Sequence, residues 1–175
     1  YPHLPAGVAC RVVDHGDADH LTVMAQRLLE AAPARFALAG HSMGARVALE
    51  VMRLAPQRVQ RLALLDTGYA PLAAGAAGEA EKAKRQALLD TARAQGMRTM
   101  AAEWAKGMVH PQRLQDEALM EAILGMCERK TADQFAAQIR ALLARPDGSA
   151  VLQSLQALGV PVVFDPVMVA TSEST

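Results

Sequence analysis

The sequence lacks a charge imbalance and has few cysteines. Its 18 Lys and Arg residues balance 18 Asp and Glu residues, so the formal net charge is zero. Because no strong field attracts a polyanion, we expect no nucleic-acid partner and instead a small, neutral or weakly charged molecule as the ligand. The two cysteines, Cys10 and Cys127, lie far apart without metal-ligand or redox spacing. We therefore expect no metal, no other cofactor, and free thiols in a reducing, cytoplasmic compartment.

Long apolar runs are missing as well. The longest candidates are broken by Arg11, Arg61 or Asp165, and none approaches the roughly 20 apolar residues that cross a bilayer. We therefore expect no membrane association. The chain opens at Tyr1, without an initiator methionine or a charged-then-apolar signal segment, so we expect it to be part of a longer protein. No feature of the sequence indicates the oligomeric state.

What the sequence does contain is an alternation of strand and helix patterns. Hydrophobic residues make up 51% of the chain, which is enough for one sizeable core. Short apolar runs bounded by turn residues predict buried strands, and apolar residues at helical spacing predict amphipathic helices. These patterns give, in order, a strand at 8–13, a helix at 21–32, a strand at 35–39, a helix at 47–54 and a strand at 59–65. Strands that alternate with helices of this length predict βαβ units and a parallel sheet.

Residues 73–145 depart from this rhythm. They are rich in Ala, Leu, Met, Glu and Lys, and they show no strand pattern. Gly96, Gly107 and Pro111 divide this region into three or four predicted helices. The sequence therefore predicts a helical insertion into an otherwise alternating chain.

The insertion's last helix is predicted to start at Thr131, because Thr131 and Gln134 have the spacing of a capping box. The alternation of strand and helix patterns resumes after the insertion. A further helix is predicted at 149–158 and a further strand at 160–164. We therefore predict three parts, namely a core at 1–72, a helical insertion at 73–145 and a return to the core at 146–175.

One motif in the core carries chemistry. Gly40-His41-Ser42-Met43-Gly44 matches G-x-S-x-G, in which a serine nucleophile stands on a sharp turn between a strand and a helix. We expect Gly40 and Gly44 to leave room where the helix crosses the strand. The turn also places Ser42 at a helix N-terminus, where the Met43 N–H can donate to a developing oxyanion. A chance glycine-rich turn or a phosphate site would show the same letters, but the flanking strand and helix patterns favour a nucleophile.

Together with the strand pattern that ends at Leu-Leu-Asp66, these residues resemble the α/β-hydrolase superfamily, and in particular its lipase, esterase and lactonase branch. The resemblance implies the α/β class, with a partial α/β-hydrolase fold whose mostly parallel sheet has flanking helices and a helical cap at 73–145. It also implies a hydrolase that attacks small esters, thioesters or lactones through a serine nucleophile. Ala45 departs from the family, because many members carry a second glycine there.

The rest of the catalytic triad is poorly represented. The family orders it as nucleophile, acid and histidine. His110 in the insertion is the only histidine after the motif, and we expect it to be a poor general base, so the base has no position here. We expect the turn to aim the His41 side chain away from Ser42, into a structural role beneath the site. Asp66 occupies the acid position of some members, although we favour a turn-capping role for it. Asp165 is a weaker candidate for the acid.

Further family features are missing. The second oxyanion donor comes from a loop after the family's third strand, which would precede this chain, and without that strand residues 8–13 face a gap or a foreign neighbour. We therefore expect marginal stability and little activity from the isolated chain. Two alternative functions stay open: a non-catalytic binding module that keeps the turn as architecture, and a lyase-like or peroxidase-like member of the superfamily.

Overall fold

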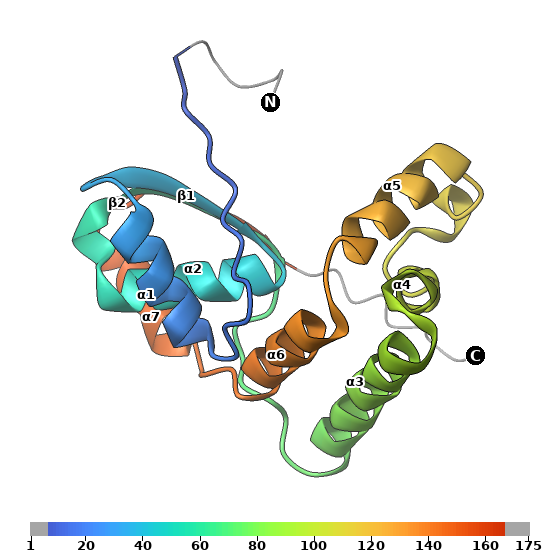
Figure 1. The fold of residues 1–175 in the computed structure, drawn as a ribbon. Coiled ribbons are helices and arrows are strands. Elements are labelled where there is room, and N and C mark those ends of the chain that lie inside the picture. Colours follow the sequence, from blue (N-terminus) through green and yellow to red (C-terminus); the bar gives the residue numbers. More distant parts are fainter. Residues whose placement is uncertain (1–6, 167–175) are drawn as a thin grey trace.

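The structure, a computed structural model, describes residues 7–166 and arranges them as three strands and seven α-helices (Figure 1). Two short 3-10 helices, Pro56–Arg58 and Pro111–Arg113, lie in connections. The elements are, in chain order, α1 Leu21–Ala31, β1 Phe36–His41, α2 Met43–Leu54, β2 Val59–Thr67, α3 Ala76–Gln95, α4 Met97–Ala105, α5 Glu117–Glu128, α6 Ala132–Leu143, α7 Ser149–Ala157 and β3 Val162–Pro166.

The three strands form one parallel sheet in the order β1-β2-β3. Leu38 of β1 lies opposite Leu62 of β2, and Leu64 of β2 lies opposite Phe164 of β3. The helix α2 connects β1 to β2, while all of α3 to α7 lies between β2 and β3 in the chain. The predicted α/β class and parallel sheet are therefore confirmed.

The hydrophobic core lies on one face of this sheet. Helices α1, α2 and α7 lie together beneath the sheet (Figure 1), and Met24 and Val51 from the first two pack with Leu62 and Leu64 of β2 in a single buried cluster. Fully burying such a side chain contributes about 1.5–3 kcal/mol. On the opposite face Ala37 is exposed, so within residues 7–166 this sheet is covered from one side only.

The strand predicted at 8–13 is wrong. These residues form no strand and are all exposed, with Val12 at 72%. A backbone in extended conformation becomes a strand only when a neighbour accepts and donates its hydrogen bonds. Within the described part of the chain, no strand pairs with β1 on the side away from β2, so the apolar pattern of 8–13 has nothing to pair with.

The insertion contains four α-helices, α3 to α6, and no strand, as the sequence predicts. The capping box is present, since the Thr131 side chain accepts from the Gln134 N–H and the Gln134 side chain accepts from the Thr131 N–H. Figure 1 shows these helices grouped beyond the end of the sheet at which β1 runs into α2. The division into three parts stays a prediction, and residues 167–175 of the third part lie outside the described residues.

No helix within residues 7–166 combines the length and the apolar character needed to cross a membrane.

A buried carboxylate joins α1 to α2. Glu50 has 4% of its side chain exposed, and it accepts hydrogen bonds from Thr22 Oγ1 at 2.6 Å and from Arg53 Nη2 at 2.8 Å. Burial alone would raise the pKa of Glu50, but the hydrogen bonds from Arg53 and Thr22 outweigh burial and hold this pKa below its ordinary value. The charged form of Glu50 therefore stabilises the contact between the two helices.

We predict that Glu50→Gln lowers the free energy of unfolding at pH 7 by about 1–3 kcal/mol, because it removes a charge-assisted network and leaves buried groups poorly paired. Urea denaturation measures this loss. The loss should shrink as the pH falls below the ordinary pKa of 4.5, since protonation of the wild-type carboxyl removes the same charge. The exposed Glu30→Gln on α1 serves as the control and should change stability by less than about 0.5 kcal/mol. Equal effects of the two substitutions would contradict the assigned role of Glu50.

Candidate active site

Ser42 lies on a sharp turn between β1 and α2, as the sequence predicts. Its backbone has φ 51° and ψ −116°, a conformation that costs a residue with a Cβ about 1–3 kcal/mol and persists only where neighbours enforce it. The residue is exposed and follows the carboxyl end of β1, which is where open α/β sheets place their ligands. The turn geometry is therefore confirmed, whereas the nucleophilic role of Ser42 stays a prediction.

Neighbouring backbone holds the turn on both sides. The Ser42 N–H donates to Leu65 O of β2 at 2.9 Å, and Ser42 O accepts from the Ala45 N–H at 3.1 Å, which begins α2. Thr67, which is almost fully buried, donates from Oγ1 to the same Ser42 oxygen at 3.1 Å. Sequence reasoning missed Thr67, whose only signal is a threonine at the end of a buried strand pattern.

The two motif glycines have different roles. A Cβ at Gly40 would lie 2.5 Å from Ala45 N and still closer to Gly44 O, so only glycine allows α2 to cross β1 at this distance. A Cβ at Gly44 would meet no atom within 4 Å, so the steric demand predicted for Gly44 is wrong in this chain. The methyl group of Ala45, where the family often has glycine, is fully buried in the core.

The first N–H of α2 is free to serve a ligand. Met43 opens this 12-residue helix, and within residues 7–166 its N–H donates no hydrogen bond. Free N–H groups at a helix N-terminus carry partial positive charge and favour an anion placed before them. The Met43 N–H therefore lies where half of an oxyanion hole is expected.

Asp66 and His41 form a pair beside Ser42. Asp66 has φ 46°, and Ser42 and Asp66 are the two residues other than glycine with positive φ in the described part of the chain. Asp66 Oδ2 lies 3.4 Å from His41 Nε2, and the two side chains are 57% and 69% exposed. Both are thus accessible at the carboxyl ends of adjacent strands.

These positions correct two expectations. The role predicted for His41 beneath the site is wrong, because strand alternation places it with Ala37 and Ala39 on the open face of the sheet. The turn-capping role favoured for Asp66 is not supported, because within residues 7–166 its carboxylate accepts no backbone hydrogen bond.

Asp165, the weaker candidate for the acid, and His110, the one histidine after the motif, lie in different parts of the fold. Asp165 of β3 lies opposite Leu65 of β2, so it stands at the same end of the sheet as Ser42. His110 lies in the connection between α4 and α5, where its Nδ1 accepts from the Gln112 N–H at 3.3 Å and caps a short 3-10 helix. This bond engages Nδ1 alone, so the expectation that His110 is a poor general base stays a prediction.

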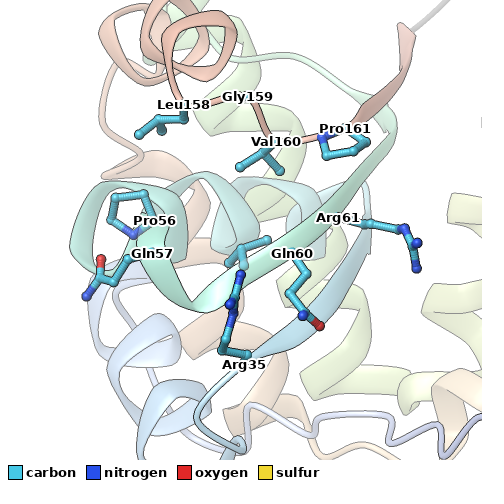
Figure 2. A pocket seen from close by; sticks show the side chains of 10 residues that line it. Arg35, Pro56, Gln57, Gln60, Arg61, Leu158, Gly159, Val160 and Pro161 are labelled. Atoms are coloured by element: carbon cyan, nitrogen blue, oxygen red, sulfur yellow. The ribbon is translucent and has the colours of Figure 1, made fainter.

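A cavity of about 600 Å³ lies at the opposite end of the sheet. Figure 2 shows Leu158 and Val160 on one side of it and Pro56 on another, with Arg61 directed away. These residues surround the amino end of β2 and the turn before β3. Because Ser42 follows the carboxyl end of β1, this cavity is not part of the candidate active site.

No family model and no curated protein matches the sequence. Solved structures do match the fold. A carboxylesterase of the thaumarchaeon Nitrososphaera gargenis aligns with a TM-score of 0.68 at 20% identity, over 86% of this chain and 54% of its own. A thermophilic esterase of Thermogutta terrifontis aligns with a TM-score of 0.63 at 21% identity, over 89% of this chain and 56% of its own. An enol-lactonase of Burkholderia xenovorans aligns with a TM-score of 0.60 at 14% identity, over 87% of this chain and 66% of its own.

The chain has part of the α/β-hydrolase fold. It spans about half the length of the first structures that it matches, so the predicted partial α/β-hydrolase fold is confirmed. The structural alignments establish the α/β-hydrolase fold. Because the sequence identities are low, the alignments do not establish an activity, which has to be argued from the site itself.

We predict that Gly40→Ala destabilises the protein by several kcal/mol, because its methyl group would force α2 away from β1. Gly44→Ala is the matched control at the other motif glycine. It should cost less than about 1 kcal/mol, since the methyl group meets open space and alanine favours helices. Thermal unfolding compares the two. Similar losses from both substitutions would contradict the different roles assigned to Gly40 and Gly44.

Proposed function

We propose that this chain carries the nucleophile of a hydrolase that acts on small ester, thioester or lactone substrates. The observation that supports this most is the Ser42 backbone, which is held in a strained conformation on an exposed turn with a free N–H next to it. Strain of this kind gathers at functional sites, because ordinary folding stability gives no reason to retain it. The esterases and the enol-lactonase with a similar fold agree with this reaction class.

The proposed reaction proceeds through an acyl-enzyme. Ser42 Oγ attacks the substrate carbonyl carbon and passes its proton to water, and the Met43 N–H donates to the carbonyl oxygen, which becomes negatively charged in the tetrahedral intermediate. Collapse of this intermediate breaks the bond from the carbonyl carbon to the alcohol oxygen, thiol sulfur or ring oxygen, which takes up a proton from water, and it leaves an acyl group on Ser42. Water then attacks the acyl carbon, which releases the carboxylic acid and restores the hydroxyl.

The acid and the base of the proposed triad are less well defined than the nucleophile. Asp66 is our candidate for the acid, because it is exposed beside Ser42 and contacts an imidazole, that of His41. Within residues 7–166 no histidine is hydrogen-bonded to Ser42 Oγ, so we assign no general base. Both acylation and deacylation need proton transfer. We therefore expect the 175-residue chain to acylate slowly and to turn over more slowly still.

The helices α3 to α6 are proposed to cover the substrate as a cap. They lie at the end of the sheet that carries Ser42 (Figure 1). Met108 and Met126 in this region are 59% and 49% exposed, and unbranched thioethers adapt to apolar groups of varied shape. An apolar acyl or alcohol group is therefore the expected neighbour of these side chains.

The unassigned base favours one second candidate, a non-catalytic binding module that retains the turn as architecture. The two candidates differ in what they predict for Ser42, because a serine without activation does not react with mild electrophiles.

We predict that a fluorophosphonate probe forms a covalent adduct on Ser42 of the folded chain. Ser42→Ala should abolish the adduct, while Ser154→Ala should leave it unchanged, because Ser154 donates to Val151 O within α7. Intact-mass and peptide mass spectrometry measure the adduct and its position. The same preparations should hydrolyse nitrophenyl acetate only slowly.

Two results would contradict the proposal. Adducts that persist in Ser42→Ala would show that the probe reacts elsewhere, and a folded wild-type chain without any adduct would favour the non-catalytic module.

A further inference from the structure

The strain at Ser42 is shared with the neighbouring strand. Ser42 and Asp66 both have positive φ, and the Ser42 N–H is bonded to Leu65 O, one residue before Asp66. Thr67, one residue after Asp66, donates to Ser42 O. The two strained residues are therefore mechanically coupled, and whatever holds residues 66–70, here called the β2 exit segment, also holds the Ser42 turn.

The side chain of Arg46 contacts this segment from α2. It lies in the first turns of α2, and its Nη1 donates to Ala70 O at 3.0 Å. Its guanidinium also lies against the backbone of Gly68, where a Cβ would stand 3.2 Å from Nη2. Tyr69 O of the same segment accepts from the Gly148 N–H at 2.9 Å. The β2 exit segment is thus fixed at successive residues.

A second guanidinium reaches the same carbonyl from the insertion. Arg145 Nε lies 3.4 Å from Ala70 O, and its Nη1 and Nη2 each donate to a carboxylate oxygen of Glu81 on α3 at 2.8 Å. The Arg145 side chain is 9% exposed. These bonds, together with a hydrogen bond from Arg85, lower the pKa of Glu81 to about 2, so Glu81 stays charged at neutral pH. The helical insertion is therefore tied to the β2 exit segment.

The position of Arg46 carries an electrostatic cost. Within residues 7–166 Arg46 has no carboxylate within ion-pair distance. Burial and then the nearby charge of Arg145 lower the pKa of Arg46 to about 10. Arg46 remains charged at pH 7, yet it sits partly buried beside a like charge. Such a cost is retained where a local arrangement serves function.

We propose that Arg46 is a positioning residue for the chemistry at Ser42: through Ala70 it holds the β2 exit segment, and thereby the strained conformations of Asp66 and Ser42. Arg145 and Glu81 extend this hold to α3 of the insertion. The inference rests on the proposed function, because positioning has meaning only if Ser42 reacts.

The chain offers a matched control for Arg46. Arg58 is also partly buried and also donates to backbone carbonyls, reaching Leu29 O in the last turn of α1 at 2.9 Å and Ala32 O at 2.8 Å. It does so next to the amino end of β2, away from Ser42. Arg46→Ala and Arg58→Ala therefore remove the same kind of interaction from opposite ends of the sheet.

The first test measures fluorophosphonate labelling of Ser42 as a function of probe concentration, alongside thermal unfolding. We expect Arg46→Ala to lower the limiting first-order labelling rate by about tenfold to a hundredfold, with the half-saturating probe concentration nearly unchanged. Arg46→Lys should restore most of the rate. Arg58→Ala removes four hydrogen bonds to backbone carbonyls, so it should lower the melting temperature at least as much and leave the limiting rate unchanged. If Arg46→Ala does not fold, Arg46→Met and Arg58→Met, which keep the length of the side chain and remove its donors, give the same comparison.

A second test does not depend on reactivity. Amide hydrogen exchange at the Ser42 N–H should be about five- to tenfold faster in Arg46→Ala than in the wild type, and unchanged in Arg58→Ala. Unchanged exchange in Arg46→Ala, or equal effects of Arg46→Ala and Arg58→Ala on the limiting labelling rate or on exchange at the Ser42 N–H, would overturn the inference. A wild-type chain without labelling would defeat the proposed function alone, and exchange would then decide whether Arg46 holds the turn.

Discussion

The architecture of the site depends on how closely α2 crosses β1. At Gly40 the two elements approach to a distance that excludes even a methyl group, and this contact bends the chain so sharply that Ser42 takes a positive φ. A larger residue at position 40 would move α2, and with it the Met43 N–H. The packing of α2 on the sheet, which forms the main core, therefore also sets the geometry of the site.

The strain produced by this crossing is distributed over two strands. Hydrogen bonds from Ser42 to Leu65 and from Thr67 to Ser42 join the end of β1 to the end of β2, so the positive φ of Asp66 and that of Ser42 belong to one arrangement. Arg46 then connects this arrangement to α2. A site of this kind is preorganised, because the backbone around Ser42 is held in place before a ligand arrives.

Much of this could be predicted from the sequence, because the signals are local. The motif around Ser42 has a steric cause, and alternating strand and helix patterns indicate a parallel sheet. Residues 8–13 show the limit of such patterns, since an apolar run cannot reveal whether a partner strand exists. The role predicted for His41 was wrong because the predicted strand ends at residue 39, whereas β1 continues through His41. The contact of Arg46 and Arg145 with Ala70 joins distant positions, so only the folded chain reveals it.

A crystal structure of the chain after reaction with an organophosphonate would test the central claim most directly. The account predicts a bond from phosphorus to Ser42 Oγ, a positive φ at residue 42 and a phosphoryl oxygen within hydrogen-bonding distance of the Met43 N–H. A Ser42 with ordinary helical or extended backbone, or a phosphoryl oxygen directed away from the N-terminus of α2, would contradict it.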